Sequence, residues 1–415
     1  MLKLAVALVA ILFGTLSGAA HASTYNVSAA DCGNTINQTG PGAISLPATT
    51  GMPSACLIAV CNSSPNQAGQ HALSLVGFPA SLQPRLYMTQ CIVVKNLSGT
   101  WAQLSDPGRF RPNYYPQLYV DNAGSDANDG LVSNASGNAL KTTQACANIL
   151  QNEYDLGTYQ PTCSFTGGQT FGPVSIVGPL TGSSVINFGG NGGQATIQAA
   201  SGGGMAMFLG DYAPYIISTN ITFDCTGGSA SCFSIFLHQQ SGVDLNNGTI
   251  LKGAGAGNVG LSCDSYGKTN ISSDGISPIT LQGTMSQGFA GGLGCMFQVD
   301  HGITLAPSTT IAASLVSLAG NASFQYTGAL TAGSGVSLAE FFTLRSGATV
   351  CASGLTVSGT FSGARQFSVL NNAVLVNASS VSLPGSAGLS SFTGYAPGFA
   401  PDGSGGNTGV NAPGC

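Results

Sequence analysis

From Cys163 onward, short apolar runs are separated by clusters of Gly, Asn and Ser. Some runs alternate apolar and polar residues and others are continuous, and each covers only a few positions. This pattern predicts many short β-strands joined by turns. The clearest runs lie at 174–177, 185–188, 195–198, 215–217, 220–223, 243–245 and 249–251.

An approximate repeat appears late in the chain, where the segments 328–335, 353–360 and 379–386 resemble one another at offsets of 25 and 26 residues. A recurrence of this length, made of strands without intervening helices, predicts the coils of a solenoid. The alternative is a β-sandwich, which explains short strands but not a repeat of coil length. The asparagine pairs 246–247 and 371–372 suit tight corners between strands, where left-handed backbone favours Asn and Gly.

One amphipathic helix precedes these strands. The segment 119–131 is rich in Asp, Asn and Gly, and the segment 139–150 then places Ala145, Ile149 and Leu150 on one face, with Thr142 or Thr143 as the N-cap. A single short helix at this position is expected to cover the open end of the solenoid.

The first 22 residues have the pattern of a secretory signal peptide. Lys3 supplies the positive charge, an apolar run follows at 4–13, and Ala20-His21-Ala22 is the expected cleavage site. The apolar run is shorter than the roughly 20 residues that a membrane-spanning helix needs, and no basic stop-transfer flank follows it. We therefore expect a secreted, cell-surface or periplasmic protein without a membrane span.

Changes in composition divide the chain into five segments. They are a signal peptide (1–22), a small β-rich domain (23–116), the first segment of the solenoid with its capping helix (117–162), the parallel β-helix (163–392) and a Gly/Pro/Ser-rich tail (393–415). The predicted fold class is all-β.

Charged residues make up 6% of the chain, against roughly 25% in ordinary soluble domains. The 10 Lys and Arg residues form no basic cluster, which argues against nucleic acid as a partner. The surface is expected to be covered by hydroxyl and amide groups.

All 12 cysteines follow the predicted signal peptide, and an even number in an oxidising compartment predicts disulfides. Spacing suggests the pairs 225–232, 146–163, 263–295 and 351–415, and leaves three connectivities open for cysteines 32, 56, 61 and 91. Zinc is disfavoured because the four histidines are scattered.

The stretch from Tyr119 to Gly130, followed by Thr142-Thr143-Gln144-Ala145, resembles the beginning of right-handed parallel β-helix proteins of the pectin-lyase-like superfamily. That superfamily includes polysaccharide lyases and hydrolases, bacterial surface proteins and phage tailspike-like proteins. The resemblance implies a right-handed β-helix with a capping helix, and a homotrimer if the tailspike-like relatives are the guide. A phage tail protein carries no secretion signal, so this chain departs from that group.

Polysaccharide lyases of this architecture combine aspartates with an Arg or Lys base. The densest matching set is Asp244, Asp264, Lys252 and Lys268, which we take as candidate catalytic residues; the alternative is scattered surface charge. Tyr212, Tyr215 and Tyr266 are candidates for stacking on sugar rings, with packing in the core or in a ladder between strands as the alternative.

Other motifs are weaker. The hydrolase motifs of polygalacturonases are absent as such, and the nearest stretch, 299–302 with Asp300 and His301, is expected at a corner. The segment 126–130 suggests a calcium loop, but Asx turns explain it without a metal. We predict no cofactor, with calcium as the alternative.

These observations lead to three hypotheses. The first is a β-helix whose polar face binds a polysaccharide or a cell-surface glycan. The second is a polysaccharide lyase or glycoside hydrolase acting on acidic glycans, which requires the four candidate catalytic residues to converge in one cleft. The third is a structural or adhesive module.

Overall fold

The fold was analysed in a computed structural model of the 415-residue chain. The structure describes residues 20–21, 24–39, 43–63, 73–77, 85–87, 90–97, 99–104, 108–112, 115–131, 133, 138–228, 230–271, 278–352, 355–363, 365–370, 373–376 and 389–391. Three parts of the chain discussed above lie outside these residues: the tail at 393–415, most of the predicted signal peptide, and the asparagines 371 and 372.

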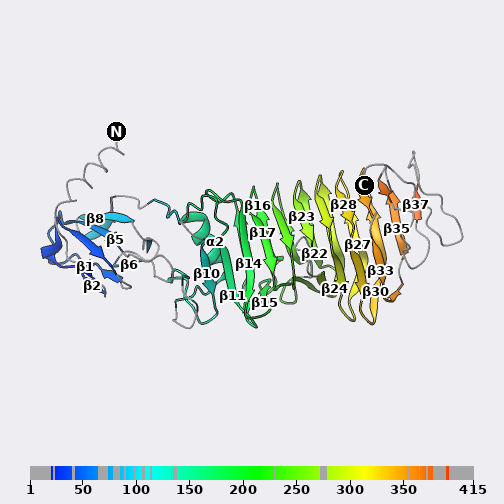
Figure 1. The fold of residues 1–415 in the computed structure, drawn as a ribbon, viewed down its shortest axis with the longest axis horizontal. Helices are drawn as coiled ribbons and strands as arrows, with labels where there is room; N and C mark the ends of the chain where they lie inside the picture. Colours follow the sequence, from blue (N-terminus) through cyan, green and yellow to red (C-terminus); the bar gives the residue numbers. More distant parts are fainter. Residues whose placement is uncertain are drawn as a thin grey trace.

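A right-handed parallel β-helix forms the larger part of the molecule, and its coils are stacked along the long axis (Figure 1). Each coil contributes strands to three faces. The first face is a ten-stranded parallel sheet. It contains β10 (Gln117–Val120), β11 (Thr162–Thr166), β14 (Val185–Asn191), β17 (Tyr215–Thr219), β20 (Gly242–Leu245), β23 (Lys268–Ile271), β25 (Met296–Val299), β28 (Ser323–Tyr326), β32 (Thr349–Cys351) and β36 (Val374–Val376).

The second face follows the first in each coil. It contains β12 (Thr170–Phe171), β15 (Ala195–Gln198), β18 (Ile221–Asp224), β21 (Ile250–Ala254), the first part of β24 (Ile279–Leu293), β26 (Gly302–Leu305), β29 (Ala329–Ala332) and β33 (Thr356–Ser358).

The third face completes the coil. It contains β13 (Val174–Val177), β16 (Met205–Gly210), β19 (Phe233–Leu237), β22 (Val259–Ser265), the second part of β24, β27 (Thr310–Leu318), β31 (Glu340–Leu344), β35 (Arg365–Leu370) and β37 (Leu389–Ser391), with β30 (Val336–Leu338) and β34 (Phe361–Ser362) at its corner with the second face. Because β24 runs through both faces, the second and third faces are joined in one sheet of 18 strands.

The predicted fold class is confirmed, and the parallel ladders exclude the sandwich alternative. The apolar runs at 174–177 and 195–198 coincide with β13 and β15. Strand β24, which has 15 residues, is longer than the few residues that the sequence predicted.

Inward side chains of successive coils stack to form one continuous core. Phe289, Phe297 and Phe324 are almost completely buried there, and the rings of Phe297 and Phe324 stack with their centroids 5.7 Å apart. Burial of each such side chain contributes roughly 1.5–3 kcal/mol. The core therefore runs along the axis instead of having a single centre.

The coil length agrees with the sequence repeat, but its register differs. Ala329 in β29 pairs with Thr356 in β33, which is an offset of 27 residues instead of the 25 read from the sequence. A shift of two residues keeps the same side chains inside, because strand side chains alternate with a period of two.

Helix α2 (Thr143–Asn152) covers the N-terminal end of the solenoid, as the sequence predicted (Figure 1). Thr142 is the N-cap, and its side chain accepts a hydrogen bond from the backbone N–H of Ala145. The disulfide Cys146–Cys163 ties the helix to β11.

Carboxylates organise the segment before this helix. Asp126 accepts hydrogen bonds from the backbone N–H groups of Lys141 and Thr142, and Asp129 accepts one from Leu131. The bond to Asp129 is a local Asx turn of the expected kind, whereas the bonds to Asp126 tie this segment to the start of the helix. Among the described residues, no group of three His, Cys, Asp or Glu side chains could hold a metal ion.

The N-terminal region has two small sheets and its own apolar cluster. The first sheet contains β1 (Ala20–His21), β3 (Thr35–Gln38), β5 (Leu57–Asn62), β8 (Cys91–Leu97) and β9 (Thr100–Gln103). The second contains β2 (Tyr25–Asn26), β4 (Ala43–Ser45), β6 (Leu73–Val76) and β7 (Arg85–Leu86), and a short 3₁₀ helix spans Ala29–Asp31. Strand β1 pairs with β3 but lies within the predicted signal peptide, so cleavage after Ala22 would leave β3 as the edge strand of the first sheet.

The Tyr87 side chain joins this region to the cap of the solenoid. The Tyr87 ring stacks on Phe110 at 5.0 Å and meets Tyr154 edge-on at 4.9 Å. Its hydroxyl donates a hydrogen bond to the Glu153 carboxylate. The two parts of the chain therefore share a buried aromatic contact.

The predicted disulfides 146–163, 225–232 and 263–295 are present. The connectivity left open by the sequence is Cys32–Cys56 and Cys61–Cys91. Cys351 is also disulfide-bonded, while Cys415, its predicted partner, lies outside the described residues. No helix in the described ranges is long and apolar enough to cross a membrane.

Asp121 leads to a prediction about acid stability. Burial alone raises the pKa of this carboxyl, but hydrogen bonds from Thr166, Ala123 and Gln169 outweigh burial and lower the pKa. A lowered folded-state pKa stabilises the fold above the unfolded-state pKa of about 3.9, and this stabilisation is lost as the pH falls through the folded-state value.

We expect Asp121→Asn to reduce the free energy of unfolding by about 1–2 kcal/mol at pH 7 and by clearly less at pH 3. Urea unfolding at both pH values measures this difference. An equal loss at pH 7 and pH 3 would contradict the role assigned to the ionised carboxylate.

Candidate functional site

The four candidate catalytic residues do not converge. Asp244 and Lys268 lie on the first face, in the neighbouring strands β20 and β23. Lys252 lies on the second face in β21, and Asp264 lies on the third face in β22. The single cleft that a lyase would need is therefore not formed by this set, because coils of the solenoid distribute nearby sequence positions over three faces.

Lys252 has a local partner instead. Its Nζ lies 2.9 Å from the Oδ2 of Asp224, which is the residue paired with it on the neighbouring strand β18. Asp224 is buried and also accepts a hydrogen bond from the backbone N–H of Thr226. This ion pair satisfies a buried carboxylate on the second face.

Tyr215 packs within the first face. A side chain at Gly242 would collide with the Tyr215 ring, so the absence of a Cβ there lets the ring lie flat over the strand. Burial raises the pKa of the Tyr215 phenol, and the neighbouring Asp244 carboxylate raises it further. Tyr215 is therefore a half-buried residue of the ladder on the first face, packed against the neighbouring strand, and is not part of the axial core.

Tyr212 and Tyr266, in contrast, are 59% and 62% exposed. Both lie in the turns that lead from the third face to the first face, which we call the edge. Backbone hydrogen bonds stack these turns: Tyr212 N–H donates to Gln239 and Gln240 N–H donates to Ser265. The two rings are therefore about two coils apart, roughly 9–10 Å.

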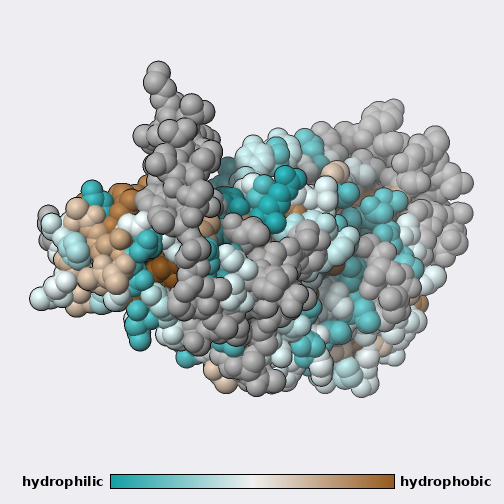
Figure 2. Space-filling model, turned by 60° about the vertical axis from the view of Figure 1, so that its left-hand side comes forward, coloured by the Kyte–Doolittle hydropathy of each residue, from teal (hydrophilic) through white to brown (hydrophobic). Residues whose placement is uncertain are grey.

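Exposed apolar side chains gather along this edge. In the described part of the solenoid from residue 163 onward, all five exposed large hydrophobic residues belong to it or to the strand ends beside it: Val177, Tyr212, Tyr266, Leu293 and Met296. The rest of the visible solenoid surface is mostly hydrophilic or neutral (Figure 2). Such a concentration on a polar protein indicates an interaction site.

The backbone at the edge is strained where the bulky residues lie. Five residues of these turns have positive φ values, which are 52° at Asp211, 65° at Tyr212, 42° at Gln239, 56° at Gln240 and 52° at Tyr266. Left-handed backbone costs roughly 1–2 kcal/mol for each such residue. Later turns of the same edge use mostly glycine and asparagine, which adopt positive φ more easily, as at Gly294, Asn321 and Gly347, although Ser346 also has a φ of 52°. Strained residues of this kind are typical of functional sites.

A row of hydrogen-bonding groups lies beside the tyrosines. His238 follows β19, and its Nδ1 lies 2.6 Å from the Oδ2 of Asp264. Its Nε2 faces the Oδ1 of Asp211 at 4.0 Å. Ser265 donates a hydrogen bond to the other oxygen of Asp264, so that this carboxylate is held from two sides. We call Asp211, His238 and Asp264 the carboxylate–histidine row.

Aromatic rings border the row on the third face. Phe208 and Phe236 are paired on neighbouring strands, and their rings stack at 5.8 Å. The Phe208 ring also stacks against the imidazole of His238 at 6.4 Å. Both phenylalanines are partly exposed, so the row has an apolar platform beside it.

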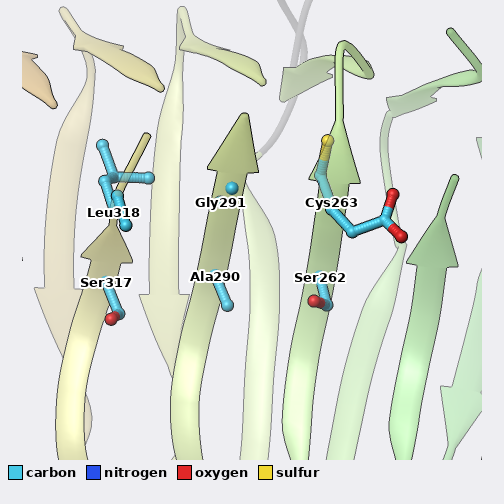
Figure 3. Close-up of a pocket in the computed structure, with 9 residues that line it drawn as sticks. Ser262, Cys263, Ala290, Gly291, Ser317 and Leu318 are labelled. Atoms are coloured by element: carbon cyan, nitrogen blue, oxygen red, sulfur yellow. The ribbon is translucent and has the colours of Figure 1, made fainter. Parts of the chain in front are cut away.

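A shallow groove continues from the row across the next coils. Ser262, Ala290 and Ser317 lie side by side on three adjacent strands, and their small side chains form its floor (Figure 3). Asp264, Gly292 and Ala319 line the side toward the edge, and the groove has a volume of about 290 Å³.

The sequence found part of this site. It named Asp264, Tyr212 and Tyr266, but it missed Asp211, His238, Phe208 and Phe236. The members of the row are about 26 residues apart in the sequence. They could be grouped from the sequence only if the register between successive coils were already known. The stretch with Asp300 and His301 forms a corner between β25 and β26, as expected.

No protein-family model matches this chain, and a comparison with curated proteins finds no match either.

The ion pair on the second face gives a testable prediction. We expect Lys252→Met to lower the free energy of unfolding by about 1–3 kcal/mol, because it leaves the buried Asp224 carboxylate without its cation. Thermal or urea unfolding measures this loss. A stable Lys252→Met protein that has instead lost function would return Lys252 to the candidate catalytic residues.

Proposed function

We propose that this protein is a secreted β-helix that binds a carbohydrate polymer along the edge and the adjoining groove. The observation that carries the proposal is the concentration of exposed tyrosines, in strained turns, next to the carboxylate–histidine row. Aromatic rings stack on the apolar faces of sugar rings, and the carboxylates and imidazole accept or donate hydrogen bonds to sugar hydroxyls.

Secretion is supported by the signal-peptide pattern of residues 1–22 and by the disulfides, which persist in oxidising compartments. Membership of the pectin-lyase-like superfamily is part of the same proposal. Its support is the segment from Tyr119 to Gly130 and the capping helix that follows it. A homotrimer, which the tailspike-like relatives imply, stays a prediction that sedimentation analysis can test.

Hydrolysis of the bound glycan is a second candidate function. Inverting hydrolases use two carboxyl groups about 6.5–9.5 Å apart. Asp211 and Asp264 flank His238 and belong to coils about 9–10 Å apart. One carboxyl group would protonate the leaving oxygen and the other would activate water. A lyase has less support, because Lys252 and Lys268 lie on other faces.

We expect Tyr212→Ala and Tyr266→Ala each to weaken glycan binding about two- to tenfold, since each removes one stacking surface. A glycan array identifies the ligand, and calorimetry with the best ligand measures the change. Leu104→Ala is the control: Leu104 is an exposed apolar residue that follows β9 in the N-terminal region, outside the solenoid. Equal binding by wild type and both tyrosine variants would show that the edge is not the site.

If the chain hydrolyses its ligand, Asp264→Asn should slow release of reducing ends at least about 100-fold, because it removes acid–base catalysis. Binding should persist in this variant. If the wild type binds a glycan but releases no reducing or unsaturated ends, the protein recognises glycans without cleaving them. If neither binding nor cleavage is detected in any assay, a structural or adhesive module is favoured.

A further inference from the structure

The groove has chemically different ends. At one end, the Asp264 carboxylate lines the groove, and the Asp211 carboxylate lies beyond it on the other side of His238. The same line of outward positions continues from Asp264 through Gly292 and Ala319, both of which line the groove. The next position in the line is Arg345, because Leu318 pairs with Leu344 and the backbone N–H of Arg345 donates to Leu318. The side chain of Arg345 therefore extends from a position one coil beyond the groove.

The Arg345 guanidinium is exposed and makes no ion pair with any described residue. In a chain with only 10 Lys and Arg residues, a cation at this place is notable. The Lys252 ammonium is paired with Asp224, whereas the Arg345 side chain remains available to a ligand that follows the groove.

Arg345 lies three coils from Asp264, which corresponds to about 14 Å at the spacing of neighbouring strands. The Debye length at physiological ionic strength is about 8 Å. The carboxylates at one end therefore do not cancel the field of the guanidinium at the other, and the two ends act on different parts of one polymer.

We propose that Arg345 is a specificity-determining residue that binds the carboxylate of a uronic acid, while Asp211 and Asp264 exclude such carboxylates from their own end. This inference rests on the proposed carbohydrate-binding function. A guanidinium matches a carboxylate with two parallel hydrogen bonds. The preferred ligand is a linear glycan in which uronates are widely spaced among neutral sugars.

The test is calorimetry of the full secreted chain with three probes: a neutral β-glucan oligosaccharide, gellan fragments, in which glucuronates are separated by neutral sugars, and polygalacturonate, in which every sugar is a uronate. We expect gellan fragments to bind most tightly. Arg345→Gln should weaken gellan binding about two- to fivefold, as for an exposed ion pair, and should leave binding of the neutral glucan unchanged.

Lys141→Gln is the matched control, because it removes an exposed cation that lies directly before the capping helix α2, several coils before the groove. It should leave gellan binding as in the wild type. If the neutral glucan binds but Arg345→Gln leaves gellan binding unaltered, or if polygalacturonate binds best, the inference about Arg345 is wrong while the proposed function stands. If none of the probes or array glycans binds, the proposed function itself fails.

Discussion

The parallel hydrogen-bonded ladder between successive coils is the constraint on which the rest of the structure depends. Each coil satisfies its backbone groups only by pairing with the coils before and after it, and its inward side chains are buried only by that stacking. The first coil therefore needs a cover, which α2 and the disulfide Cys146–Cys163 provide. The Tyr87 contact then joins the N-terminal region to that cover.

The same ladder explains how a site can arise without disturbing the fold. Side chains that point outward, and side chains in the turns, do not contribute to the axial core, so they can vary from coil to coil. At the edge, later coils use residues such as Gly294 and Asn321 in the left-handed positions, while earlier coils carry Tyr212 and Tyr266 there. The strain is tolerated because the stacked turns hold these residues in place through backbone hydrogen bonds.

Because the solenoid carries few charged residues, the interaction partners of its ionised groups are easily identified. Asp224 and Lys252 neutralise each other on the second face. Asp211 and Asp264 share His238 where the third face meets the edge, beside the groove. With so few formal charges, recognition of a glycan at this edge depends chiefly on ring stacking and on hydrogen bonds, and a single cation such as Arg345 has a large influence on which polymers are accepted.

The sequence by itself determined the architecture, because short apolar runs, a coil-length repeat and a capped helix each reflect local chemistry that the chain carries in every coil. It also determined three disulfide pairs, since their cysteines lie within one coil or in neighbouring coils. It could not place Asp244, Asp264, Lys252 and Lys268 correctly relative to one another, because each coil passes through three faces and the composition of the turns does not show which strand belongs to which face. Only the tertiary structure decided that Asp264 meets His238 and Asp211, since these contacts depend on the exact register between coils that are hydrogen-bonded in space but separated along the chain.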